Sequence, residues 1–197
     1  MYSKRPNITV GFHGCDVSVR NSLVNLQTLP KPSRNDYDWL GHGFYFWENN
    51  EDRALQFAKE NKKIKNPCVL GAYIDLANCL DLLDSKYLNI LKQAYPFLVE
   101  SLGIIGEEVP KNSKGSSNDL LVRKLDCAVI ETLHAINKTE NILPFDTVRG
   151  VFWEGGDLYE GAGMKEKNHI QICVRNINCI KALFIPREND FSNPIIV

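Results

Sequence analysis

The chain lacks the features that would at once assign it to a membrane, to a nucleic acid or to a repeat array. None of its 197 residues belongs to an apolar run of membrane-spanning length. Its formal net charge is only −1, from 23 Lys and Arg against 24 Asp and Glu. A charge so close to zero gives no global attraction to nucleic acid, and no internal repeat is visible. We therefore expect no membrane partner, and any basic binding surface must be local.

A disulfide framework and a zinc site are also missing from the sequence. The six cysteines are scattered, and no CxxC pair occurs among them. Most lie in apolar surroundings such as Ile172-Cys173-Val174, which is typical of buried, reduced thiols. The sequence therefore predicts a cytoplasmic protein without a metal site.

The order of the predicted elements favours an α+β fold. The hydrophobic content of 44% is sufficient for one domain spanning residues 1–197. Strands are predicted near both ends of the chain and helices in the middle, which is not a βαβ series. The middle, at about 80–140, is interpreted as a helical insertion. Within it, residues 103–118 are rich in Gly, Ser, Lys and Pro and are predicted to form a mobile loop.

The stretch 38–58 divides into a glycine-rich approach, a strand and a helix. Gly41 and Gly43 bracket His42 and allow tight backbone geometry. Residues 44–47 are four successive aromatics, which predict a strand. Asn49 or Asn50 is a plausible N-cap for the helix that follows, and residues 59–67 form its basic, polar end. Alone, this pattern is that of an ordinary buried β-to-α unit.

Three blocks of sequence, one of them inside this stretch, give it a family context. The first is VGFHGC at 10–15, and the second is GHGFYF at 41–46, continued by RALQFA at 53–58. The third is NHIQICVRNINCI at 168–180. Together they resemble the ADP-ribosyltransferase superfamily, in its diphtheria-toxin and poly(ADP-ribose) polymerase-like branch. The resemblance covers both ends of the chain and leaves the middle uncovered.

The resemblance implies a fold and a substrate. It implies two small β-sheets packed face to face, with helices around them and NAD held in the cleft between them. NAD would serve as a substrate whose ADP-ribose moves to a protein or nucleic-acid acceptor, with release of nicotinamide. Such a transferase, a glycosyltransferase in chemical terms, could serve as a toxin or effector in conflict between bacteria and phages. The alternative is a binding module on the same fold that has lost turnover.

The resemblance also assigns roles to residues that could otherwise be purely structural. His13 would contact the adenosine ribose, the backbone of Gly14 would hold the nicotinamide carboxamide, and Tyr45 would stack on nicotinamide. Cys15 stands where the family has Ser or Thr. The other candidate binding residues are His42, Arg53 and Phe57.

Gln171 stands where the family carries a catalytic glutamate. A glutamine keeps a hydrogen bond to the ribose but lacks the negative charge that stabilises an oxocarbenium-like transition state. Gln171 lies on a strand predicted at residues 170–174. Residues 153–163, in the loop before that strand, are acidic and aromatic. Glu154 or Glu160 on that loop could supply the missing carboxylate. The sequence leaves the catalytic role open among Gln171, Glu154 and Glu160.

Overall fold

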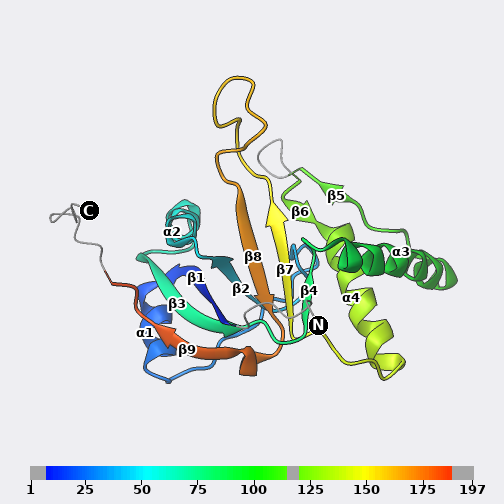
Figure 1. The fold of residues 1–197 in the computed structure, drawn as a ribbon, viewed down its shortest axis with the longest axis horizontal. Helices are drawn as coiled ribbons and strands as arrows, with labels where there is room; N and C mark the ends of the chain where they lie inside the picture. Colours follow the sequence, from blue (N-terminus) through cyan, green and yellow to red (C-terminus); the bar gives the residue numbers. More distant parts are fainter. Residues whose placement is uncertain (1–7, 115–119, 188–197) are drawn as a thin grey trace.

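The structure is a computed structural model that describes residues 8–114 and 120–187. It is α+β, as predicted, with a seven-stranded mixed sheet, a two-stranded sheet and four α-helices in the described part (Figure 1). The strands are β1 (Ile8–Asp16), β2 (Phe44–Glu48), β3 (Pro67–Asp75), β4 (Cys79–Asp81), β5 (Asn112–Ser113), β6 (Val122–Arg123), β7 (Thr147–Phe152), β8 (His169–Val174) and β9 (Ile180–Phe184). The helices are α1 (Val17–Val24), α2 (Glu51–Glu60), α3 (Ser85–Ile105), α4 (Lys124–Thr139) and a 3₁₀ turn, η1 (Ile177–Cys179).

The resemblance implies two small sheets packed face to face, whereas over residues 8–114 and 120–187 the main sheet is continuous. Its strand order is β4-β7-β8-β2-β1-β3-β9, with β4 parallel to β7 and every other pair antiparallel. The junction between β2 and β1 is narrow, because only Gly11–Glu48 and Phe12–Trp47 are paired across it. After the Phe12–Trp47 pair, the next contact between the strands is made by a side chain: the His13 ring is hydrogen-bonded to the carbonyl of Tyr45. The two halves are thus joined by a short ladder.

Hydrophobic clusters lie on the two faces of the central strands. On β8, Ile172 belongs to the cluster beneath β1, β3 and α1, whereas Cys173 belongs to the cluster covered by α3 and α4. This alternation follows from the two-residue period of a strand. Figure 1 shows α3 and α4 packed beside the β4–β7 half, and α1 beside the β1–β3 half.

The helical insertion begins with one long helix. Gly106, at φ 73°, ends α3 in the left-handed conformation that glycine tolerates. Gly103, Ile104 and Ile105 therefore belong to α3, and the loop predicted from residue 103 onwards is wrong for these three. The predicted loop also contains β5, while its residues 115–118 lie outside the described ranges.

In residues 8–114 and 120–187, no helix is both long and apolar enough to cross a bilayer. All six cysteines lie in the described ranges, where none forms a disulfide and five are buried.

Candidate functional site

A cavity of about 520 Å³ lies where β1, β2, α2 and β8 meet. We call it the central cavity. Its other walls come from the loop 33–39, residues 121 and 154, and the end of α2. Six of the residues singled out in the sequence line it: His13, Tyr45, Arg53, Phe57, Glu154 and Gln171.

Sheet register brings Gln171 into this cavity. Gln171 is directly opposite Trp47 of β2, and both residues line the cavity. Residues opposite each other in a sheet point to the same face, and residue i+2 shares that face. Tyr45 therefore lies on the same face as Trp47. Ile172 points to the other face and is fully buried there, as its place in the alternating pattern predicts.

His13 is held as a neutral imidazole. Its Nδ1 lies 2.8 Å from the carbonyl oxygen of Tyr45. Because a carbonyl only accepts, Nδ1 must carry the proton, which leaves Nε2 as an acceptor. Burial lowers the pKa of His13, an effect partly opposed by the hydrogen bond to Tyr45. A neutral ring with an acceptor nitrogen suits a ligand hydroxyl.

The hydroxyl of Tyr45 makes two hydrogen bonds within the protein. It donates to the Gly41 carbonyl at 2.6 Å and accepts from the Leu40 backbone N–H at 2.8 Å. Gly41 has a φ of 75° and thus takes the left-handed conformation in this turn. Since the hydroxyl is engaged by the turn, the ring is the part of Tyr45 that can contact a ligand.

Helix α2 supplies a second wall of the cavity. The Asn50 side chain accepts from the Arg53 backbone N–H at 3.0 Å and caps the helix, as predicted for this position. Arg53, Phe57 and Asn61 follow at four-residue spacing and all line the cavity.

Arg53 and Glu154 form an ion pair in this wall. The Nη2 of Arg53 lies 2.7 Å from Oε2 of Glu154, and Arg53 is only 7% exposed. Within the described ranges, the Nε and Nη1 atoms of Arg53 and the indole Nε1 of Trp47 are buried without an acceptor. Unpaired buried donors are costly, so groups of this kind suit a ligand that supplies oxygen atoms.

His169 orients Gln171. The Nδ1 of His169 lies 2.6 Å from the Lys167 carbonyl oxygen, so Nδ1 is the protonated nitrogen and Nε2 is an acceptor. The Gln171 amide nitrogen lies 3.1 Å from that Nε2 and donates to it. The carbonyl oxygen of Gln171 is therefore the end that a ligand hydroxyl can reach. Burial also lowers the pKa of His169 and favours the neutral ring.

Four of the candidate residues do not line the central cavity. Gly14 packs under α2, where an added Cβ would lie 2.1 Å from the Ala54 carbonyl oxygen. Cys15 is buried opposite Cys68, and burial raises the pKa of its thiol to about 12. His42 lies against Glu131, with Nδ1 3.4 Å from a carboxylate oxygen. Glu160 is exposed on the β7–β8 loop, which extends beyond the end of the sheet (Figure 1).

A second hollow, of about 530 Å³, adjoins the central cavity through shared residues. We call it the adjoining hollow. It is lined by α1 and by the segment 28–33. His13, Ser33 and Tyr45 line both spaces. An elongated ligand could therefore occupy both, with His13 and Tyr45 at the junction.

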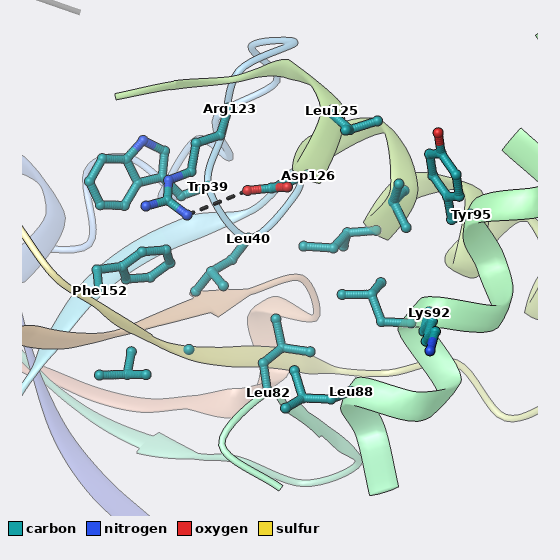
Figure 2. A pocket seen from close by; sticks show the side chains of 15 residues that line it. Trp39, Leu40, Leu82, Leu88, Lys92, Tyr95, Arg123, Leu125, Asp126 and Phe152 are labelled. Atoms are coloured by element: carbon teal, nitrogen blue, oxygen red, sulfur yellow. Dashed lines mark hydrogen bonds and ion pairs between the residues drawn. The ribbon is translucent and has the colours of Figure 1, made fainter. Parts of the chain in front are cut away.

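A third hollow, of about 510 Å³, lies between the sheet, α3 and α4 and is mostly apolar (Figure 2). We call it the apolar hollow. At one end Arg123 stacks over Trp39 and Phe152, with its guanidinium carbon 4.6 and 5.0 Å from the two ring centroids. Arg123 also pairs with Asp126 at 3.4 Å. Trp39 lines both this hollow and the central cavity and so separates them.

Sequence reasoning missed several residues of the site, among them Trp47 and His169. A signal for these two was present, because Trp47 is two residues from Tyr45 on a predicted strand, and His169, just before a predicted strand, is two residues from Gln171. The loop residues Ser33, Asn35 and Asp38 carried no such signal. The Asp38 carboxylate accepts hydrogen bonds from the other two and shapes the loop that walls the cavity.

Comparison of the chain with protein-family models, curated proteins and solved structures gives no match. The function must therefore be argued from the site itself.

Proposed function

We propose that this protein is an NAD-dependent ADP-ribosyltransferase. One observation carries the proposal: His13, Tyr45 and Gln171, from three separate blocks of the sequence, line one cavity. Each carries a group that fits its proposed role: an acceptor nitrogen, an aromatic ring and an amide oxygen. A role as a toxin in conflict between bacteria and phages rests on family analogy alone.

The two adjoining spaces, which share His13, Ser33 and Tyr45 as lining residues, would each take one half of a dinucleotide. In our proposal, nicotinamide occupies the central cavity against the ring of Tyr45, an aromatic face against a cationic ring. The adenosine half extends into the adjoining hollow, and its ribose hydroxyl donates to Nε2 of His13 at the junction. The unpaired donors of Arg53 and Trp47 would meet carboxamide or phosphate oxygens of NAD.

The proposed reaction breaks the bond between nicotinamide and the ribose anomeric carbon. The bonding electron pair leaves with nicotinamide, which becomes neutral, and positive charge develops on the ribose. A nucleophilic atom of the acceptor then bonds to the anomeric carbon and loses its proton. The Gln171 carbonyl oxygen would accept from a ribose hydroxyl, and this bond strengthens as the ribose becomes cationic.

Glu154 is a better candidate than Glu160 for the carboxylate that Gln171 lacks. Glu154 lines the same cavity as Gln171, whereas Glu160 is exposed outside it. Because Glu154 is paired with Arg53, part of its charge is offset until a ligand engages the arginine. Glu154 is thus our proposed charge-stabilising residue, and Gln171 the hydrogen-bonding one.

Nicotinamide release from NAD by purified variants tests the proposal. Glu154→Gln and Gln171→Ala should each reduce the rate by at least about tenfold, because each removes an interaction strongest in the transition state. Glu160→Gln is the matched control on the same loop and should leave the rate within about twofold. Rates unchanged in both Glu154→Gln and Gln171→Ala would refute these assignments.

A second candidate function is an NAD-binding module without turnover. The observation in its favour is that neutral Gln171 replaces a charged residue while Glu154 is held by Arg53. The two functions separate in one comparison: calorimetric NAD binding without any nicotinamide release would support the module over the transferase.

A further inference from the structure

The end of α2 places a basic segment at the rim of the central cavity. Asn61 lines the cavity and ends α2, and the next residues include Lys62, Lys63 and Lys65. The Asn61 side chain accepts from the Lys63 backbone N–H at 3.1 Å, and the Asn61 carbonyl accepts from Ile64 N–H at 2.9 Å. These bonds hold the lysine backbone in a turn directly beside the cavity.

The lysines of this turn are not neutralised by carboxylates. Lys62, Lys63 and Lys65 are exposed, and in the described part of the chain none forms an ion pair. Several other lysines do: Lys124 lies 2.7 Å from Asp36, and Lys167 lies 3.0 Å from Glu60. Because the whole chain has a net charge of −1, this is a local excess of positive charge.

A second basic segment, residues 31–34, borders the same two spaces. Lys31 lines the adjoining hollow, and Ser33, which lines both spaces, is followed by the exposed Arg34. Two exposed aromatic side chains line the central cavity next to these segments. Tyr37 is 45% exposed and Phe57 is 38% exposed. Exposed cations and exposed aromatic rings thus occur together in the segments that border the two spaces.

We propose that this rim, Lys31 to Tyr37 and Phe57 to Lys65, binds single-stranded nucleic acid. Phosphates would contact the lysines and Arg34, while unstacked bases would stack on Tyr37 and Phe57. In a duplex the faces of the bases are stacked on one another, so a duplex would contact only the lysines and Arg34, through its phosphates. The inference rests on the proposed function and identifies its acceptor class. The acceptor of ADP-ribose would be a nucleic-acid strand bound across the opening of the NAD site.

The test measures fluorescence polarisation of labelled single-stranded RNA and DNA of about 15 nucleotides, from about 50 to 200 mM salt. Lys62→Glu/Lys63→Glu should weaken binding at least about tenfold and make the salt dependence shallower, because phosphate contacts are lost. Lys92→Glu/Lys138→Glu is the matched control. It makes the same charge change at exposed lysines of α3 and α4 and should leave affinity within about twofold. Tyr37→Ala should weaken single-strand binding severalfold.

The RNA and DNA arms identify which strand is the preferred ligand. The inference fails if neither strand binds at low salt, or if both lysine pairs weaken binding equally. It also fails if a duplex of the same length binds as tightly, or if polyglutamate displaces the strand, since that would favour an acidic protein partner.

Nicotinamide release measured without oligonucleotide separates this inference from the proposed function. Lys62→Glu/Lys63→Glu should retain that release, because neither lysine lines the cavity. If the wild-type protein releases nicotinamide but binds no strand, the nucleic-acid site at the rim is refuted and the transferase is not. Strand binding that maps to the rim, without release in the wild type, would overturn the transferase and leave the rim as a nucleic-acid site.

Discussion

The central cavity and the apolar hollow have almost the same volume, about 520 and 510 Å³, yet very different chemistry. In the first, buried polar groups converge, and donors of Arg53 and Trp47 lack acceptors among the described residues. In the second, leucine and valine side chains predominate, and the Arg123 guanidinium is paired with Asp126 (Figure 2). Volume alone would rank the two spaces equally. Unsatisfied buried polar groups favour the central cavity as the functional site.

The largest expected difference concerns two glycines on elements that border the two spaces: Gly14 of β1, which packs against α2, and Gly103 within α3. Gly14→Ala should destabilise the fold by about 2–3 kcal/mol, because its Cβ would meet the Ala54 carbonyl and push α2 away from β1. Gly103→Ala in α3 meets nothing within 4 Å and should stabilise the fold by about 0.5–1 kcal/mol. Chemical denaturation of both variants measures this, and equal effects would contradict the tight packing of α2.

The next difference concerns ligand binding. Tyr45→Ala should weaken NAD binding by about 1–2 kcal/mol through loss of an aromatic contact, measured by calorimetry. Leu88→Ala, in the apolar hollow, should leave NAD affinity unchanged. Tyr45→Phe separates ring from hydroxyl: it should keep NAD affinity while losing about 1 kcal/mol of stability with the two hydrogen bonds. NAD bound equally well by a folded Tyr45→Ala protein would exclude this cavity as the nicotinamide site.

The smallest expected effect is on the pH dependence of stability. His13 and His169 line or support the central cavity, and burial lowers the pKa of each below its ordinary value of about 6.5. Below that pH the unfolded chain takes up protons that the folded state resists, so stability falls as the pH drops. Melting temperature should therefore decrease from pH 7.5 to 5.5, and His169→Gln should flatten the decrease. A slope unchanged in His169→Gln would show that His169 is not held neutral.

Local patterns were enough to predict much of the fold. The aromatic run predicted β2, and the α+β class followed from element order. The polar residues after β2 predicted an N-cap at Asn49 or Asn50, and the cap of α2 is Asn50. The long middle helix was harder to predict. A proline usually interrupts a helix, yet Pro96 lies inside α3, which continues to Gly106 and is supported by packing of Ala94 and Leu98 in the core.

The sequence by itself determined that Gln171 points to the face of its strand opposite to Ile172, because side chains alternate along a strand whichever strands it pairs with. It likewise determined the four-residue stripe of Arg53, Phe57 and Asn61, which any helix would place on one face. Only the tertiary structure decided that Arg53 meets Glu154, 101 residues away, and that His13 bonds the backbone of Tyr45. Such contacts depend on sheet register and helix docking, which the whole core fixes and no local propensity encodes.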